Sequence, residues 1–261
     1  MFKTRLISWI ILFVVIFLVL FLGGPVLLLA SMIVSVLGMR ELYNAMGIKR
    51  DSVTFLELAA YLSVVVYYIA AYLDFDRYGA LFMIIPMILV ICVYVFCFPI
   101  FKAEETMITW FGVMYVGVMF SFLMLTRNMP GGEPMVLVAA ISAFGCDTFA
   151  YLTGRLIGKH KMAPLLSPNK TVEGALGGIV TSLVLSLLVG IGIGESPLKY
   201  ALAGGVGALA GIVGDLAASA IKRNKGIKDY SNLIPGHGGI LDRFDSMLFV
   251  APVVYFFARL F

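Results

Sequence analysis

Five carboxylates in the second half of this 261-residue chain stand in or beside segments that are otherwise apolar. They are Asp147, Glu173, Asp215, Asp242 and Asp245. A carboxylate at the centre of a membrane helix costs about 2.5–3.5 kcal/mol on insertion scales, so acids in such places are candidates for a functional site. Asp242 and Asp245 are three residues apart, which puts both on one face of a helix. Oxygen ligands grouped in this way suit Mg²⁺.

Two basic, glycine-containing stretches accompany these acids, one from Gly154 to Thr171 and one from Lys222 to Gly239. Lys and Arg offset the charge of phosphate, and glycine lets the backbone approach a ligand closely. Acids beside such loops predict a site for a polyphosphate with a divalent cation. The residues of interest in the two stretches are Arg155, Ser167, Lys170, Thr171, Lys222, Arg223, Lys228, Asp229, His237, Gly238 and Gly239.

Residue spacing leaves two classes of protein open. Lys and Arg are expected in the inner loops of any membrane protein, and intramembrane acids fit an ion or proton pathway as well as an enzyme. The chain has no P-loop, no H-E-x-x-H and no G-x-S-x-G sequence, so these motifs do not decide between them. Cys92, Cys97 and Cys146 lie in apolar runs without metal-site spacing and are interpreted as small buried side chains.

The composition identifies the solvent around most of the chain as lipid. Hydrophobic residues make up 61% and charged residues only 13%, too few polar groups to cover a water-exposed surface. A soluble enzyme, a disordered chain and a nucleic-acid-binding domain are therefore excluded. We expect an all-α, multi-pass protein of a cell membrane.

Apolar runs bounded by charges, Gly or Pro predict nine membrane spans. The uncharged stretch from Leu6 to Gly38 would form a helix of about 50 Å, too long for a hydrocarbon core of about 30 Å. The chain is therefore expected to turn at Gly23-Gly24-Pro25. The predicted spans are 6–22, 25–39, 54–73, 80–101, 106–125, 135–156, 172–194, 200–221 and 240–261.

The basic residues predict how these spans are oriented. With the N-terminus in the cytoplasm and the C-terminus outside, 14 of the 19 Lys and Arg residues fall on the inner side and 4 on the outer side, with Arg243 inside the last span. Asp147 and Asp215 each lie eight residues before an inner arginine, and Glu173, Asp242 and Asp245 follow inner loops. All five acids are therefore expected at a similar depth near the cytoplasmic surface.

This pattern divides the chain into two functional halves. Residues 1–134 are expected to form a scaffold of transmembrane helices with dimer contacts, and residues 135–261 the catalytic helices with cytoplasmic loops 157–171 and 222–239. In the first half, Glu41 and Glu57 stand near membrane edges, where water can solvate them. The sequence assigns neither a role.

A longer pattern separates the enzyme from the transporter. The run from Ser219 to Asp245 resembles the signature of the phosphatidate cytidylyltransferases, or CDP-diacylglycerol synthases. It carries Ser, Lys-Arg, Lys-Asp, His-Gly-Gly and Asp-Arg-x-Asp at the intervals of that family. The stretches 147–155 and 167–174 and the pair Gly214-Asp215 resemble other blocks of the family, with Asn169 standing where many members have Lys. The resemblance is specific over about residues 140–250.

The resemblance implies an all-helical membrane enzyme, dimeric, with a site open to the cytoplasm. It implies transfer of CMP from CTP to phosphatidic acid, a membrane lipid, with one or two Mg²⁺ ions as cofactor and no nucleic-acid partner. The expected roles follow the family pattern. Asp215, Asp242 and Asp245 are expected to hold the metal, and Lys222, Arg223, Lys228 and Arg243 to hold the triphosphate or the lipid phosphate. Backbone N–H groups of His237-Gly238-Gly239 are expected to contact phosphate. The remaining substrate-binding residues are Asp147, Arg155, Ser167, Lys170, Thr171, Glu173, Ser219 and Asp229.

Three alternatives make different demands on the sequence. An ion-coupled transporter needs no nucleotide and places its acids near mid-membrane at broken helices. A CTP-dependent polyprenol or phytol kinase has an alcohol as acceptor, which requires a base, and does not explain the signature over 219–245. A CDP-alcohol phosphotransferase needs a D-G-x-x-A-R element, which the chain lacks.

Overall fold

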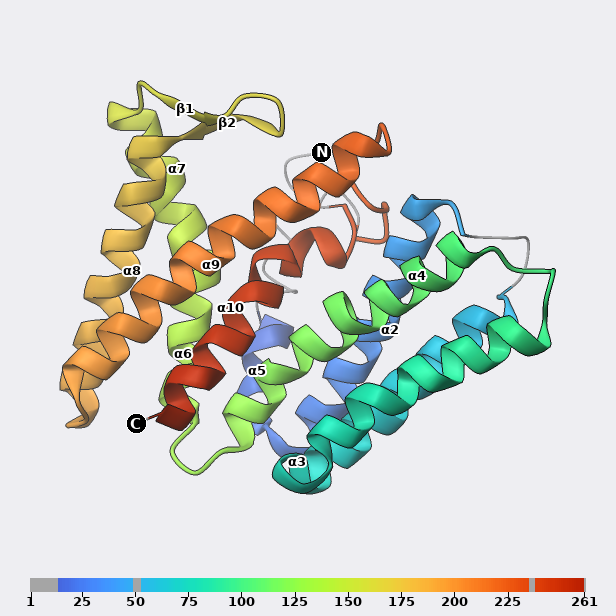
Figure 1. Cartoon of the computed structure of the whole chain (residues 1–261). Helices are drawn as coiled ribbons and strands as arrows, with labels where there is room; N and C mark the ends of the chain where they lie inside the picture. Colours follow the sequence, from blue (N-terminus) through green and yellow to red (C-terminus); the bar gives the residue numbers. More distant parts are fainter. Residues whose placement is uncertain (1–13, 49–52, 235–237, 261) are drawn as a thin grey trace. The chain divides into compact units, whose positions relative to one another are not determined.

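The computed structural model describes residues 14–48, 53–234 and 238–260, and these residues are nearly all α-helical (Figure 1). The chain forms two compact units. The first comprises the described residues up to Leu125 together with Asp229–Arg243, and the second comprises Thr126–Lys228 and the residues from Phe244 onward. The stretch before and at the start of the last helix thus belongs to the first unit. The expected division by function, into a scaffold over 1–134 and catalytic helices over 135–261, stays a prediction.

The first unit is built from long helices that follow a break at two glycines. Residues 14–22 are helical, and Gly23 and Gly24 have positive φ angles of 61° and 49°, which only glycine adopts at low cost. The chain therefore breaks where the sequence predicted. The helices that follow are α2 (Gly24–Met46), α3 (Phe55–Phe96), α4 (Ala103–Gly112), the π-helix η1 (Val113–Val118) and the beginning of α5 (Met119–Asn128).

Helix α3 is two helical arms joined by a turn. Asp74 leaves the helical conformation, with φ −164° and ψ 92°, and the ribbon of α3 doubles back there (Figure 1). Leu56 from the first arm packs with Val90 from the second and with Phe101 beyond it. The two arms therefore lie side by side, as expected for the separate predicted spans 54–73 and 80–101.

Buried tyrosines connect the helices of the first unit. Three of these tyrosines have a hydroxyl group hydrogen-bonded to a neighbouring helix, which offsets the cost of burying it. The pairs are Ser35 with Tyr68 at 2.8 Å, Tyr67 with Ser121 at 2.9 Å, and Tyr43 with the carbonyl oxygen of Thr109 at 2.7 Å.

The second unit combines helices with one small hairpin. Its elements are α6 (Glu133–Ala140), the π-helix η2 (Ile141–Gly145), α7 (Cys146–Ile157), β1 (Lys161–Ala163), β2 (Ser167–Thr171), α8 (Val172–Ile193), α9 (Pro197–Asn224) and most of α10 (Leu241–Leu260). The strands pair antiparallel, with Lys161 opposite Thr171. The sequence predicted only a loop over 157–171, so the hairpin is new.

Glycines let α8 approach both of its neighbours, α7 and α9. A Cβ atom at Gly178 would lie 2.7 Å from the carbonyl oxygen of Cys146 on α7. A Cβ atom at Gly204 on α9 would lie 2.9 Å from the carbonyl oxygen of Ser182 on α8. Real Cβ atoms do not come this close to backbone, so these glycines set the spacing of the helices.

Within the described residues, six helices are long and apolar enough to cross a bilayer, which agrees with a membrane protein. They are Gly24–Met46, Phe55–Gly79, Ala103–Asn128, Glu133–Ile157, Val172–Ile193 and Pro197–Asn224. The nine predicted spans are not all represented. The span 6–22 is described only from residue 14 onward, and 80–101 contains a shorter apolar helix, Ile84–Phe96. The span 240–261 forms α10, whose first five residues include three charged ones.

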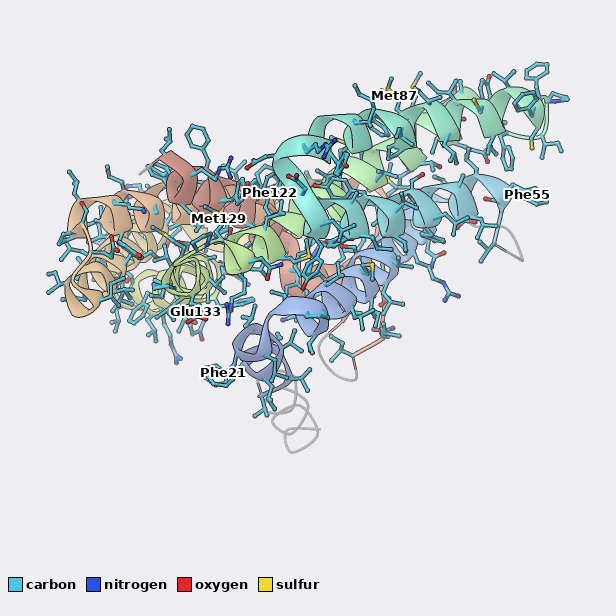
Figure 2. All side chains as sticks on the ribbon, turned by 90° about the horizontal axis from the view of Figure 1, so that it is seen from below. Phe21, Phe55, Met87, Phe122, Met129 and Glu133 are labelled. Atoms are coloured by element: carbon cyan, nitrogen blue, oxygen red, sulfur yellow. The ribbon has the colours of Figure 1, made fainter. Side chains whose placement is uncertain are left out.

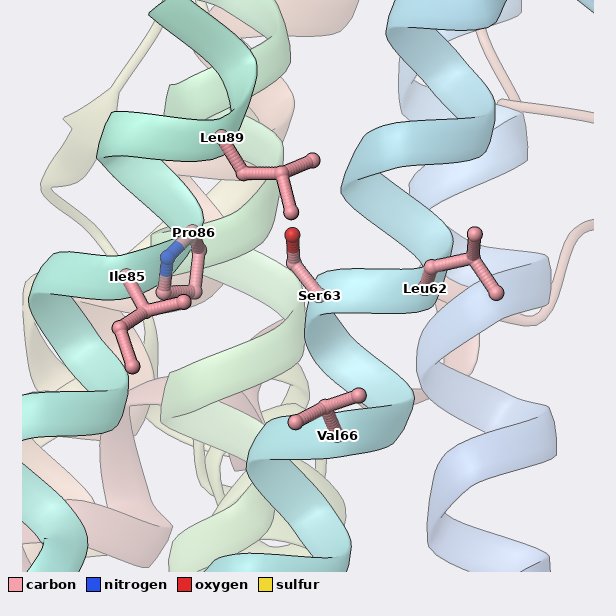
Figure 3. Close-up of a pocket in the computed structure, with 6 residues that line it drawn as sticks. All are labelled: Leu62, Ser63, Val66, Ile85, Pro86 and Leu89. Atoms are coloured by element: carbon pink, nitrogen blue, oxygen red, sulfur yellow. The ribbon is translucent and has the colours of Figure 1, made fainter. Parts of the chain in front are cut away.

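The outer surfaces of the helices are apolar. Phe55 and Phe21 are 70% and 72% exposed, and Figure 2 shows their side chains directed away from the ribbon. A groove of about 90 Å³ between the arms of α3 has the same character (Figure 3). The hydroxyl group of Ser63 there donates to Ala59 of its own helix at 2.6 Å. These surfaces suit lipid and offer no group for chemistry.

Candidate functional site

The second unit contains a pocket of about 580 Å³ bounded by α7, the β1–β2 hairpin, the start of α8 and the middle of α9. Such a volume falls within the usual range for small-molecule sites. The pocket also has wall residues that sequence reasoning did not select, among them Tyr151, Met162 and Asn169. Six residues selected from the sequence do line it: Asp147, Arg155, Ser167, Lys170, Thr171 and Asp215.

An ion pair between Lys170 and Asp215 crosses this pocket wall. Lys170 lies on β2 and Asp215 on α9, and their side chains are 27% and 21% exposed. Ser219, one turn further along α9, donates to the same carboxylate at 3.5 Å. The pocket wall therefore carries a carboxylate and an ammonium group that neutralise each other, and a ligand in the pocket can contact both.

Glu173 has a different position from the one expected. Its carboxylate accepts from the backbone N–H groups of Lys159 at 3.0 Å and His160 at 3.2 Å, and contacts Nδ1 of His160 at 2.5 Å. Thr171 caps α8 by accepting from the N–H of Gly174 at 3.2 Å. Glu173 is not among the residues that line the pocket. Its contacts with Lys159 and His160 hold the base of the hairpin that forms the pocket wall.

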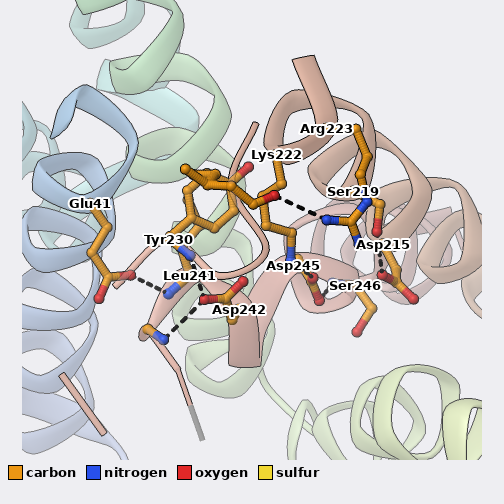
Figure 4. A network of polar contacts seen from close by, with 12 residues as sticks. Glu41, Asp215, Ser219, Lys222, Arg223, Tyr230, Leu241, Asp242, Asp245 and Ser246 are labelled. Carbon is orange, nitrogen blue, oxygen red and sulfur yellow. Dashed lines mark hydrogen bonds and ion pairs between the residues drawn. The ribbon is translucent and has the colours of Figure 1, made fainter. Parts of the chain in front are cut away.

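In the second unit, Lys222 near the end of α9 and Asp245 of α10 lie close together (Figure 4). Lys222 and Asp245 are 8% exposed each, and their charged atoms are 4.0 Å apart. A Cβ atom at Gly214 would lie 2.8 Å from the carbonyl oxygen of Asp245, so the two helices are in close contact at this level. Arg223 is exposed and donates to the carbonyl oxygen of Ile227 at 3.0 Å.

Asp242, in the first unit, holds the loop that precedes α10. Its Oδ2 atom accepts from the N–H groups of Tyr230 at 2.8 Å and Gly239 at 2.9 Å (Figure 4). Gly238 supports this turn with a φ of +85°, which favours glycine. The N–H of Gly239, expected from the sequence to face a phosphate, thus bonds a carboxylate of its own chain.

Within the first unit, Glu41 is a partner of the loop before α10 that sequence reasoning missed. Its side chain on α2 is buried, with the residue 4% exposed, and it accepts from Ser231 Oγ at 2.6 Å and from the N–H groups of Ile240 at 3.0 Å and Leu241 at 2.8 Å. The expectation that Glu41 and Glu57 are solvated is wrong, because Glu57 is also only 3% exposed. A lone acid near a helix end gives no signal of partners about 200 residues away.

The remaining candidates are less closely held. Lys228 and Asp229 are exposed at the end of the basic loop. Arg243 is half-buried, and its Nε atom has no hydrogen-bond partner among the residues that the structure describes. His237 lies outside the described residues.

The acids fit a magnesium ion by their chemistry. Among the described residues, no three or more His, Cys, Asp or Glu side chains gather closely enough to form a ready-made metal cluster. Mg²⁺ at nucleotide sites is usually bound by one or two carboxylates together with substrate phosphates and water. Asp215 and Asp245, on two helices packed at Gly214, supply that kind of donor set in the second unit.

Comparison with known proteins gives a consistent match over almost the whole chain. The model of the cytidylyltransferase family matches residues 3–261. A protein of Staphylococcus haemolyticus (strain JCSC1435) is 34% identical over 255 residues, and one of Staphylococcus aureus (strain COL) is 35% identical over 257 residues, with 97% of both chains covered in each case. A protein of Bacillus subtilis (strain 168) is 40% identical over 165 residues, which cover 62% of this chain and 61% of that protein. All three relatives are named phosphatidate cytidylyltransferase.

Proposed function

The chain belongs to the cytidylyltransferase family, and we infer that it is an enzyme that makes CDP-diacylglycerol and pyrophosphate from CTP and phosphatidate. The observation that carries this conclusion is the family match over residues 3–261. The relatives with the same reaction in their names cover the chain almost completely, so the match includes both units and every candidate site residue.

The pocket in the second unit is proposed as the nucleotide site. Arg155 and Lys170 bring two cations to its wall, and phosphate groups need such compensation. Ser167, Asn169 and Thr171 add polar groups from the hairpin strand. Polar groups that converge in a pocket of this size are what a nucleotide requires.

The reaction needs charge compensation more than a base. A phosphate oxygen of phosphatidate attacks the α-phosphorus of CTP, a new P–O bond forms, and the bond to the pyrophosphate group breaks. The lipid phosphate is already ionised near neutral pH, so no side chain has to remove a proton. Because two anions approach each other, positioning and neutralisation are the main catalytic terms. We assign neutralisation of the triphosphate or the lipid phosphate to Lys222, Arg223, Lys228 and Arg243.

Asp215 and Asp245 are proposed to hold Mg²⁺, and the sequence assigns Asp242, three residues before Asp245 on the same helix, as a third ligand. A bound Mg²⁺ would neutralise phosphate charge and orient the oxygens of the in-line displacement. An ammonium group lies beside each of these carboxylates, that of Lys222 beside Asp245 and that of Lys170 beside Asp215.

The membrane arrangement is proposed from the distribution of Lys and Arg. We propose nine spans, a cytoplasmic N-terminus, an outer C-terminus and a site that opens to the cytoplasm, because 14 of 19 basic residues then lie on the inner side. CTP reaches such a site from the cytoplasm, while phosphatidate keeps its acyl chains in the bilayer. We also propose that two copies of this chain form a homodimer.

One assay tests the function. Purified protein receives labelled CTP, Mg²⁺ and phosphatidate, and CDP-lipid and pyrophosphate are measured; we expect both in equal amounts. Asp242→Asn should abolish CDP-lipid formation with insertion intact, whereas Asp74→Asn, at the turn of α3, should keep the wild-type rate. Absence of CDP-lipid, phosphorylation of a polyprenol, or ion flux without nucleotide would overturn the proposed function. A near-wild-type rate in Asp242→Asn would reject the assignment of that residue.

A further inference from the structure

Glu41 is buried at the junction of α2 with the loop that leads into α10, within the first unit. Its two carboxylate oxygens accept three hydrogen bonds of 2.6–3.0 Å, all from residues of that loop or from the first residue of α10. A buried carboxylate costs several kcal/mol unless it is hydrogen-bonded, so these three contacts determine where it can lie. In return, Glu41 supplies acceptors for N–H groups that the start of a helix leaves without partners.

The contact is close enough to restrict the loop sequence. A Cβ atom at Gly239 would lie 2.6 Å from one carboxylate oxygen of Glu41, so a larger residue there would displace the carboxylate. The N–H of the same Gly239 donates to Asp242. Gly239 thus touches Glu41 on one side and is bonded to Asp242 on the other.

Two acids therefore bond one loop, each of them at both ends of it. Glu41 takes the N–H groups of Ile240 and Leu241, and Asp242 takes those of Gly239 and Tyr230. These donors are consecutive over 239–241, so a shift of the Glu41 contact moves the peptide groups that orient Asp242. The charge of Glu41 also lies at the N-terminus of α10, where the helix dipole favours an anion.

We propose that Glu41 is a positioning residue for the reaction: it fixes the first turn of α10 and, through Gly239, the direction of the Asp242 carboxylate. This inference rests on the proposed function, in which Asp242 is a metal ligand. Glu41 touches neither substrate nor metal in this proposal.

Glu57 provides a matched comparison. It is as deeply buried as Glu41, at 3% against 4%, and is also a hydrogen-bonded acid at the start of a helix. Its partners, however, are the N–H and hydroxyl groups of Thr54, three residues away, in a capping box of its own helix. A Glu57→Gln change therefore alters a buried acid of the same kind without touching the loop before α10.

The test compares Glu41→Gln with Glu57→Gln in two measurements. The first is steady-state kinetics, and the second is amide hydrogen exchange without Mg²⁺ or CTP. We expect Glu41→Gln to lower kcat by about 10²-fold, since misplacement by about 1 Å has that effect, with little change in KM for CTP. Exchange should become about tenfold faster or more at Ile240 and Leu241 and also at Gly239 and Tyr230, which bond Asp242. Glu57→Gln should keep kcat and speed exchange only at the start of α3.

Several outcomes would overturn the proposal. Wild-type kcat in Glu41→Gln would do so, as would a lower kcat with unchanged exchange at Gly239 and Tyr230. Ser231→Ala removes one bond to Glu41 and the acceptor of the Leu233 N–H, and it leaves the N–H groups of Gly239, Ile240 and Leu241 with their acceptors. Ser231→Ala should lower kcat by about fivefold and speed exchange at the same amides. If both measurements stay at their wild-type values, the proposal is contradicted, even where Glu41→Gln does not fold. A wild-type protein that makes no CDP-lipid but shows the expected exchange pattern would overturn only the proposed function.

Discussion

Lys170 and Asp215 form an ion pair although 45 residues separate them in the sequence. One lies on a hairpin strand and the other in the middle of a long helix, and both line the same pocket. The pair joins two stretches that the sequence showed only as a basic loop and an intramembrane acid. It gives the pocket a carboxylate and an ammonium group whose charges compensate each other before a ligand binds.

We expect the effects of substitutions at Lys170 and Asp215 on the stability of the protein to depend on each other. Lys170→Met leaves a carboxylate without its counter-charge in a partly buried place, while the double variant with Asp215→Asn leaves no charge. A double-mutant cycle on thermal unfolding should give a coupling energy on the order of 1 kcal/mol. The same cycle on Arg127 and Glu133, whose side chains are 18% and 70% exposed, should give a smaller value. Additive effects at Lys170 and Asp215 would show that the contact does not matter for stability.

The carboxylate of Glu173 should affect nucleotide binding through the hairpin. Glu173→Gln keeps the shape but replaces one acceptor oxygen by an NH₂ group that faces N–H donors of Lys159 and His160. The wall of the pocket loosens, so we expect KM for CTP to rise by about tenfold with kcat nearly unchanged. Glu195→Gln, at an exposed position after α8, makes the same change in charge and should leave KM unaltered. A lower kcat at constant KM would contradict this explanation.

The glycine contact between α8 and α9 should be sensitive to a single methyl group. Gly204→Ala places a Cβ atom against Ser186 and Ser182, and forcing the helices apart should cost about 1–3 kcal/mol of stability. A Cβ atom at Gly192 on α8 would meet no atom within 4 Å from the described residues outside its own helix backbone, so Gly192→Ala should be neutral or stabilise by up to about 1 kcal/mol. Midpoints of thermal unfolding in one detergent compare the two. Equal shifts for both variants would show that the close approach does not determine helix spacing.

We expect removal of divalent metal to abolish the reaction and to abolish the stabilisation of the protein by CTP. With EDTA we expect no CDP-lipid, and added Mg²⁺ should restore the rate, because carboxylates and phosphates otherwise repel each other. CTP with Mg²⁺ should also raise the unfolding midpoint of the wild type, as any ligand of the native state does. Asp245→Asn should lose this shift. Full activity in EDTA would end the metal assignment.

The sequence by itself determined that lipid surrounds most of the chain, where most helices lie and which type of reaction the protein catalyses. Scarce charges demand lipid, and an apolar run of about 20 residues can satisfy its backbone only as a helix there. Local rules also predicted the break at Gly23 and Gly24, where φ is positive, and the shared helix of Asp242 and Asp245. Each of these features depends on residues near one another in the chain, which is why spacing and composition suffice.

Only the tertiary structure decided which distant groups meet. Glu41 accepts hydrogen bonds from residues about 200 positions away, and the N–H of Gly239 donates to Asp242. The β1–β2 hairpin, absent from the sequence prediction, carries Lys170 to Asp215. Such contacts arise because buried polar groups must find partners, and the packing of whole helices determines which partners are within reach. No local pattern of residues contains that information.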